Sequence, residues 1–298
     1  MSPSPFNRDL SFSYGVLAEV APGIRRIVAH NPGPFTHFGT GTYVIGRGAV
    51  AGIDAGPRDE AHVEALLKGL AGERVTHQLI THTHLDHSPG AAILKAATGA
   101  PTYGFGPHGG ERPADGVVVE EDGDRDFRPD VTVGDGALIE GEGWRVTCVH
   151  TPGHTSNHLC FALEGTGDLF TGDHVMGWST TVVSPPDGDM TAYMRSLEKV
   201  LDRGDRVLWP THGAPVTDPA PFLRHLISHR EAREAAILRA IGAGHTRIRA
   251  MVSEIYRDVD PRLHPAAARS VLAHLVKLRA EGRVRTDGPP MLESTYAL

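Results

Sequence analysis

A single run, Thr81-His82-Thr83-His84-Leu85-Asp86-His87-Ser88, packs three histidines and a carboxylate into six positions directly after an apolar stretch. A strand that ends and turns there would aim His82 and His84 to one side, and Asp86 and His87 toward a second point nearby. Imidazole nitrogens and carboxylate oxygens are the ligands that zinc prefers in catalytic sites that keep one position open for water. The run therefore predicts a site for two divalent metal ions.

Three more ligand-type side chains, His154, Asp173 and His212, each come just after a strand-like segment later in the chain. The segments before them are 144–150, 169–172 and 207–209. Strand ends are rigid enough to hold metal ligands in place. We therefore expect one shared metal site at the edge of stacked sheets.

The elements that must position these residues alternate short β-like runs with turns and amphipathic helices, which is typical of layered α/β structure. We expect a hairpin of 42–45 and 50–53, helices over 59–70 and 89–99, a strand over 75–80 and a helix that begins after residue 189. Ser88 and Asp189 are suitable N-caps for the helices that follow them. The stretch from Gly104 to Asp130 predicts a long surface loop, interrupted by Val117–Val119.

From residue 221 the pattern changes to three helices, expected over 222–241, 247–259 and 265–281, and then a short β wing over 282–288. This arrangement resembles a winged-helix unit. Residues 221–298 carry 13 Lys and Arg against 8 Asp and Glu, whereas the rest of the chain carries 16 against 28. The chain thus divides into an acidic unit, 1–220, and a basic unit, 221–298, in which Arg279, Arg283 and Arg285 are candidate phosphate contacts. A solvated helix face explains these charges equally well.

Composition indicates a globular protein, because 40% of the 298 residues are hydrophobic and 22% are charged. No secretory signal and no run long enough to span a bilayer is found in the sequence, so we expect a cytoplasmic protein without a membrane partner. Cys148 and Cys160 stand in apolar strand-like segments, and we expect buried free thiols rather than a disulfide. The oligomeric state does not follow from the sequence.

In identity, order and spacing, these motifs are similar to those of the metallo-β-lactamase-fold hydrolases: His82-x-His84-x-Asp86-His87, Thr-Pro-Gly-His154-Thr, Thr-Gly-Asp173 and Thr-His212-Gly. The resemblance covers roughly residues 31–216 and implies an αββα sandwich with a dinuclear metal site at one edge. It also implies the ligands: His82, His84 and His154 for the first ion, Asp86, His87 and His212 for the second, and Asp173 between both.

A narrower resemblance, over nearly the whole chain, is to the β-lactamase-like protein 2 group. It rests on Asn31-Pro32-Gly33-Pro34, on Gly39-Thr40-Gly41-Thr42-Tyr43, and on segments of the basic unit at 227–234 and 263–278. Animal members of that group are described as endoribonucleases acting on single-stranded RNA, and fungal relatives as thioesterases. Thr83 and Thr211 depart from the usual residues of the group, which leaves the choice of substrate open.

Two divalent cations about 3.5–4 Å apart would lower the pKa of a shared water, so that a bridging hydroxide could attack a phosphoryl or carbonyl centre. Asp86 is the candidate catalytic residue, because it could orient the nucleophile and take its proton. We expect zinc, with manganese and iron as alternatives. The sequence favours single-stranded RNA as substrate, with a small acyl thioester or lactone as the alternative. A nucleic-acid-binding regulator with a purely structural metal is a more remote alternative.

Several other residues have both a structural and a functional interpretation. Asp54 is expected to satisfy turn amides or to support a metal ligand from behind. His158 could line the substrate cleft or pack as a hydrogen-bonded core histidine. His174, beside Asp173, is a candidate supporting residue but not a ligand. His229 and Arg230 could reach the mouth of the site or only cover a helix face.

Overall fold

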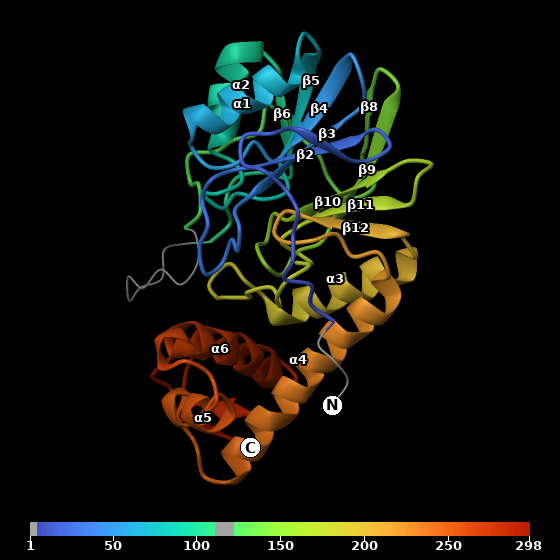
Figure 1. The fold of residues 1–298 in the computed structure, drawn as a ribbon. Helices are drawn as coiled ribbons and strands as arrows, with labels where there is room; N and C mark the ends of the chain where they lie inside the picture. Colours follow the sequence, from blue (N-terminus) through green and yellow to red (C-terminus); the bar gives the residue numbers. More distant parts are fainter. Residues whose placement is uncertain (1–4, 111–121) are drawn as a thin grey trace.

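The computed structural model describes residues 5–110 and 122–298. Two β-sheets pack face to face, with helices on both outer sides (Figure 1). The first sheet has the strand order β1-β2-β3-β4-β5-β6-β7, antiparallel as far as β4 and parallel from β4 to β7. Its strands are β1 (Ala18–Ala21), β2 (Ile24–Val28), β3 (Gly41–Ile45), β4 (Ala49–Ile53), β5 (Arg74–Leu79), β6 (Thr102–Gly104) and β7 (Val131–Thr132).

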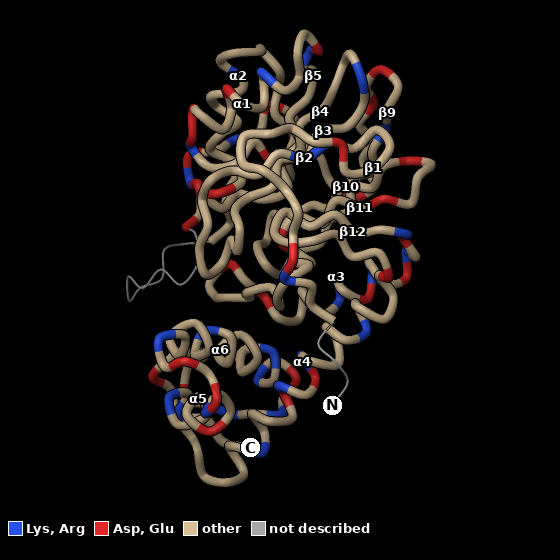
Figure 2. Tube along the Cα trace, in the orientation of Figure 1, with Lys and Arg blue, Asp and Glu red and all other residues tan. Residues whose placement is uncertain are grey.

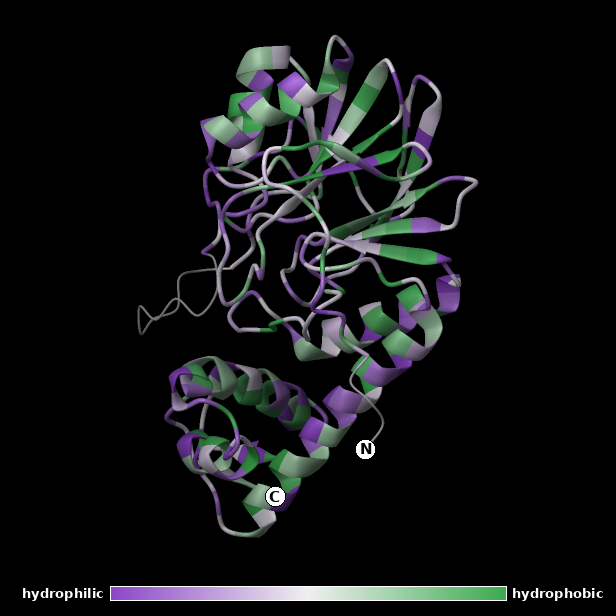
Figure 3. Ribbon diagram, viewed as in Figure 1, coloured by the Kyte–Doolittle hydropathy of each residue, from purple (hydrophilic) through white to green (hydrophobic). Residues whose placement is uncertain are grey.

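The second sheet has the order β12-β11-β10-β9-β8 and is antiparallel except for the parallel pair of β11 and β12. Its strands are β8 (Leu138–Gly141), β9 (Trp144–His150), β10 (Leu159–Leu163), β11 (Asp168–Gly172) and β12 (Val207–Pro210). Both sheets are therefore mixed. Side chains of both, such as Tyr43 and Phe170 with ring centroids 5.2 Å apart, form one apolar core between them. Figure 3 shows hydrophobic residues along the strands of both sheets.

Amphipathic helices cover the two outer faces, because each has one apolar stripe to bury. Helices α1 (Glu60–Leu70) and α2 (Gly90–Thr98) lie on the first sheet, where Leu66 and Leu94 join a shared apolar cluster. Helix α3 (Met190–Arg203) lies on the second sheet, where Leu197 packs in a second apolar cluster. The fold is thus the αββα sandwich that the sequence motifs imply.

The C-terminal part is helical and ends in a small sheet. It contains α4 (Pro219–Gly242), α5 (Ile248–Ile255), the 3₁₀ turn η1 (Pro261–Leu263), α6 (His264–Ala280), β13 (Arg285–Thr286) and β14 (Tyr296–Ala297). Phe222 near the start of α4 packs in the cluster of α3, whereas Ile237 near its end packs with α5 and α6. Helix α4 therefore contributes to both cores, and the division at residue 220 stays a prediction.

Three details differ from the sequence expectations. Helix α2 has no side-chain cap, because the Ser88 hydroxyl instead donates to Asp124 at 2.9 Å. Helix α5 ends at Ile255, short of the expected residue 259. The predicted wing supplies β13, but its partner lies outside the wing: Thr286 pairs with Tyr296.

The predicted loop from Gly104 to Asp130 is described only at its two ends, and Val117–Val119 lie outside the described residues. The C-terminal end of this loop is hydrogen-bonded to the segment 81–88: the Leu85 N–H donates to the Asp122 carbonyl at 2.9 Å. The Asp124 N–H donates to the Thr83 carbonyl at 2.6 Å. The loop thus helps to hold that segment in place.

Two smaller expectations are met. Cys148 and Cys160 are free and buried, and burial raises the pKa of each thiol to about 12. Among the residues that the structure describes, none of the helices combines the length and the apolar character that a membrane crossing requires.

Candidate metal centre

The seven predicted ligands all come together at one edge of the sandwich. His82, His84, Asp86 and His87 lie between β5 and α2, and the other three follow β9, β11 and β12: His154, Asp173 and His212. Every one of these side chains is at most 8% exposed. Strand ends therefore deliver all the candidates to a single buried place, as the sequence predicts.

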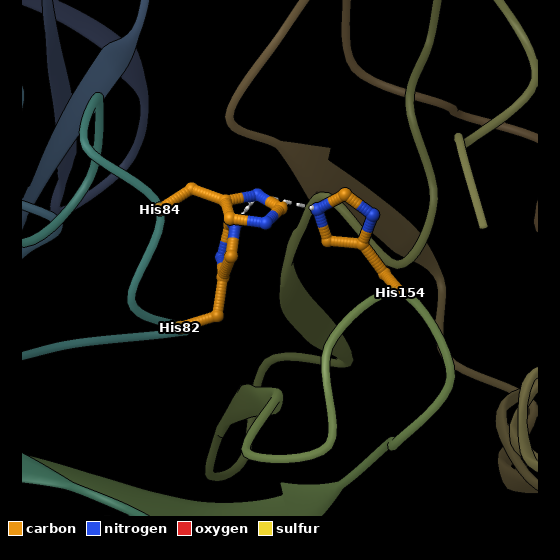
Figure 4. A group of neighbouring side chains, drawn as sticks. All are labelled: His82, His84 and His154. Carbon is orange, nitrogen blue, oxygen red and sulfur yellow. Dashed lines mark hydrogen bonds between the residues drawn. The ribbon is translucent and has the colours of Figure 1, made fainter. Parts of the chain in front are cut away.

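His82, His84 and His154 form one group, called here the three-histidine group, in which the ligand atoms lie within 4.8 Å of one another. The His84 Nδ1 lies 3.1 Å from the Nε2 of His82 and 3.1 Å from the Nε2 of His154 (Figure 4). The His154 ring is aimed by its other nitrogen, because Nδ1 bonds to the Val182 carbonyl at 2.7 Å. Three imidazole nitrogens that converge on one point are a suitable ligand set for a zinc-like ion.

Asp86, His87 and His212 form a second group, called here the mixed group, with the same 4.8 Å spacing. The Asp86 Oδ2 lies 3.1 Å from the His212 Nε2 and 3.3 Å from the His87 Nε2. Asp173 lies between the groups: its Oδ2 is 3.4 Å from the His212 Nε2 and 3.9 Å from the His154 Nε2. One carboxylate therefore touches both ligand sets.

The electrostatics of the two groups differ. Burial lowers the pKa of each imidazole in the three-histidine group, so these rings are neutral and ready to ligate. In the mixed group burial acts the same way, but the carboxylates of Asp86 and Asp173 outweigh it. They raise the pKa of His87, and that of His212 to about 10. These imidazoles would have to give up protons to bind a cation.

Two buried atoms in the centre have no hydrogen-bond partner, the Nε2 of His87 and the Oδ1 of Asp173. Unpaired buried polar atoms are costly, and each needs a specific reason. Both face a cluster of nitrogen and oxygen donors of the type that binds divalent cations. The residues present therefore fit a centre of two metal ions, although the donor set does not identify the metal.

Asp54 supports the centre from behind, as one of its two sequence interpretations proposed. Its Oδ2 bonds to the His87 Nδ1 at 2.9 Å, and its Oδ1 accepts from the Thr81 N–H at 2.8 Å. The carboxylate thus fixes the orientation of the His87 ring and leaves Nε2 for a ligand.

Thr40 is a supporting residue to which the sequence gave no role. Its hydroxyl donates to the Asp86 Oδ2 at 3.0 Å and accepts from the Asn31 side-chain amide at 2.9 Å. The preceding Gly39 has φ +128°, and a Cβ there would lie 2.1 Å from the Ala29 carbonyl oxygen. The glycines on either side of Thr40 could have indicated this role from the sequence, because a glycine is often found where the backbone is packed too closely for a side chain.

His158 is a packed core histidine and does not line a cleft. Its ring is fully buried, with Nδ1 at 2.9 Å from the Thr151 hydroxyl and Nε2 accepting from the Asp173 N–H at 3.2 Å. It therefore holds Asp173 in position. His174 is also fully buried, and neither of its ring nitrogens has a hydrogen-bond partner.

A cavity of about 430 Å³ lies on the side of the C-terminal helices, and none of the seven ligand candidates lines it. Thr181 and Val182 form part of its wall, and the Val182 carbonyl is the group that aims His154. His229 and Arg230 line the opposite side, so both reach this cavity. The neighbouring Arg233 lines it too, although the sequence gave it no functional role.

Comparison with protein families gives two matches. Residues 26–212 match the metallo-beta-lactamase superfamily, and residues 248–289 match the beta-lactamase associated winged helix domain. The second match covers α5, η1, α6 and β13 and identifies this part of the chain as a winged-helix domain.

Two similar proteins share about a third of their residues with this chain. The beta-lactamase-like protein 2 homolog of Drosophila melanogaster is 32% identical over 91% of this chain and 92% of its own length. The atrochrysone carboxyl ACP thioesterase of Aspergillus fumigatus is 32% identical over 74% of this chain and 66% of its own.

Solved structures show the same fold. A beta-lactamase domain protein from Burkholderia ambifaria aligns with a TM-score of 0.79 at 22% identity and covers 97% of this chain and 95% of its own. A metallo-beta-lactamase family protein from Thermus thermophilus aligns with a TM-score of 0.72 at 24% identity, over 94% and 99%. The chain therefore belongs to the metallo-beta-lactamase superfamily, and its buried His/Asp centre is the metal-binding motif of a hydrolase with that fold.

Proposed function

We propose that this chain is a dinuclear metal-dependent hydrolase of acyl thioesters. The observation that carries the proposal is a partly apolar cavity, with walls that include Phe35, Met176 and Leu263, which is linked to the centre through the hydrogen bond between the Val182 carbonyl and His154. An acyl chain needs apolar walls, and its carbonyl must lie beside the metal ligands. The similarity to an acyl carrier protein thioesterase supports the same substrate class.

In this proposal the three-histidine group would hold one ion, the mixed group would hold the other, and Asp173 would contribute to both. Two such cations, most suitably zinc, would lower the pKa of a water and polarise the carbonyl under attack. Asp86 orients the attacking water and accepts its proton as the new C–O bond forms. It then returns the proton to the leaving sulfur as the C–S bond breaks, which yields a carboxylic acid and a thiol.

Two of the three arginines that could have favoured RNA, Arg283 and Arg285, are engaged within the chain. Arg283 lies 3.2 Å from a carboxylate oxygen of Glu281 and 3.5 Å from one of Glu234, and Arg285 donates to the Leu298 carbonyl. Side chains that are already paired contribute less to a phosphate surface. RNA therefore becomes the second candidate, and the acyl substrate becomes the first.

The proposal is tested with purified protein loaded with zinc or manganese, assayed side by side on a panel of acyl thioesters and on labelled single-stranded RNA. We expect thioester hydrolysis that disappears in His84→Ala, since that variant removes the nitrogen shared by the three-histidine group. RNA cleavage that depends on His84, without thioester hydrolysis, would reverse the choice of substrate.

A further inference from the structure

The cavity beside the metal centre is lined by positive charge without negative charge. It lies between the segment 176–182 of the sandwich on one side and α4, the segment 256–263 and α6 on the other. Figure 2 shows Lys and Arg recurring along α4 and α6. Its basic residues are Arg8, His229, Arg230 and Arg233, and no aspartate or glutamate is among the described residues that line it. The cavity therefore has an excess of positive charge near a site that is built for hydrolysis.

Arg230 is the most buried of these basic residues, at 4% exposed. Its guanidinium donates to the Thr181 carbonyl and lies 5.3 Å from the centre of the Tyr193 ring. Within the part of the chain that the structure describes, neither Arg230 nor Arg233 forms an ion pair with a carboxylate. A buried cation without a counter-charge is costly, so a bound anion would be favoured at this place.

Arg233 presents its guanidinium for direct contact. Its Cζ lies 4.1 Å from the centre of the Tyr256 ring, so that the ring covers one face of the guanidinium and holds it in place. A guanidinium held in this way keeps its N–H edge for two parallel bonds to a carboxylate or phosphate.

The pKa of His229 reflects the same positive surroundings. Burial, and then the charges of Arg230 and Arg233, lower its pKa to about 4. Its Nδ1 is buried and has no hydrogen-bond partner. A neutral imidazole of this kind can donate one hydrogen bond to an anion in the cavity.

We propose that the cavity binds a negatively charged group of the thioester substrate, with Arg233 in direct contact and Arg230 and His229 completing the site. The assignment rests on the proposed thioester hydrolysis. The anion is either a phosphate on the thiol-bearing arm or a carboxylate on the acyl chain, since both fit an arginine edge. The apolar walls of the same cavity receive the carbon chain between this anion and the carbonyl.

Two matched pairs of substrates distinguish the sources of the anion. One pair is an acyl 4′-phosphopantetheine thioester and the same acyl pantetheine thioester, which differ only in the phosphate. The other pair is a pantetheine thioester whose acyl chain ends in a carboxylate, and the same thioester with that carboxylate converted to a methyl ester. The parent protein should prefer the charged member of one pair, as measured by the ratio of their kcat/KM values.

The variant Arg233→Gln should reduce that preference on the order of tenfold or more, the size expected for a lost hydrogen bond to a charged group. Arg224→Gln is the matched control, because Arg224 is an exposed arginine on the same helix and does not line the cavity. Its preference should equal that of the parent. No preference in the parent, or a preference that Arg233→Gln leaves unchanged, would overturn the proposal.

A binding measurement separates this proposal from the proposed function. If no thioester is hydrolysed, the proposed function fails. The cavity is then tested by calorimetry with two pairs of ligands, each with a charged and a less charged member. The first pair is the S-methyl ethers of phosphopantetheine and pantetheine, and the second is adipate and its dimethyl ester. Tighter binding of a charged member, weakened by Arg233→Gln, would retain the anion site. Equal binding within both pairs would overturn it. RNA cleavage that Arg233→Gln weakens, without any effect on thioesters, would assign the cavity to a nucleic-acid phosphate and also overturn it.

Discussion

Two buried groups of ionisable side chains lie in this molecule, and they differ in how their charges are satisfied. At the edge of the sandwich, seven ligand-type side chains face one another, and the His87 Nε2 and the Asp173 Oδ1 lack hydrogen-bond partners. Between α4 and α6, Glu234 instead lies beside two cations, Lys277 at 2.9 Å and Arg283 at 3.5 Å, and beside the His274 ring at 3.4 Å. Both oxygens of that carboxylate are engaged.

The difference separates a site from a structural support. Ligand atoms that converge without enough counter-charges leave room for cations, and their arrangement is costly until those cations bind. A carboxylate whose two oxygens are both engaged by neighbouring side chains needs no bound ion, and it ties α4 to α6. Richness in charged or imidazole side chains is therefore a weaker sign of function than the convergence of several ligand atoms on one place.

Removing the carboxylate that lies between the two ligand groups should have the largest effect. Asp173→Asn keeps the volume but takes away the charge that contacts both His154 and His212. We expect bound metal to fall to one equivalent or less. Thioester kcat/KM should fall on the order of 10³-fold, since several kcal/mol of metal stabilisation is lost and each 1.36 kcal/mol is tenfold.

Elemental analysis of metal-reconstituted protein measures the first effect and steady-state kinetics the second. Asp135→Asn is the control, because Asp135 is an aspartate paired with Lys199 outside both ligand groups. Equal metal content in Asp173→Asn and the parent would contradict the bridging role.

Asp86→Asn addresses the proton transfer. The carboxylate accepts from Thr40 and lies beside His212, so the amide removes a base while its neighbours remain. Turnover should fall by roughly 10²-fold or more, the scale of a lost general base. The metal held by the three-histidine group should remain, as spectroscopy of a cobalt-substituted sample can show. Unchanged turnover in the folded variant would leave Asp86 as a ligand only.

Much of the centre could be predicted from the sequence, because its ligands are coded locally. Each one follows an apolar run that forms a strand, and strand ends in stacked sheets meet at one edge. The short spacing from His82 to His87 also restricts where these side chains can point. The supporting contacts could not be predicted in the same way, because Thr40 and Asp86 are 46 residues apart and meet only after folding.

Strands β1, β2 and β14 were missed for a related reason. Strand β2 contains Arg25 and Arg26, and two adjacent charged residues do not indicate a buried strand in the sequence. In the structure both are only 6% exposed. Strand β13 has two residues and finds its partner in β14, beyond a stretch of irregular chain. Pairing between such short segments depends on tertiary packing rather than on local propensity.

Thr40→Val should have a smaller effect than either aspartate variant, because the supporting hydroxyl is lost while every ligand remains. Substitution of a residue that orients a metal ligand commonly costs about 10–100-fold in metal affinity or activity. We expect a decrease in that range, measured by metal titration and by turnover. Thr76→Val is the control, since the Thr76 hydroxyl bonds to the Val50 carbonyl, which belongs to neither ligand group. Equal losses in the two variants would point to a general loss of stability.

The smallest effect concerns the group around Glu234, where no ligand is expected. Burial lowers the pKa of His274 from 6.5 to about 4 in the folded protein. Above pH 6.5 the ring is neutral in both states and its contribution to stability is complete. As the pH falls from 6.5 to 4, the unfolded chain takes up a proton that the folded chain does not, so the free energy of unfolding decreases by at most about 1.4 kcal/mol per pH unit. His274→Gln, which can still donate to Glu234, should show a flatter decrease over this range. Urea unfolding of metal-free protein followed by circular dichroism at several pH values measures both curves, and parallel curves would contradict the role of His274.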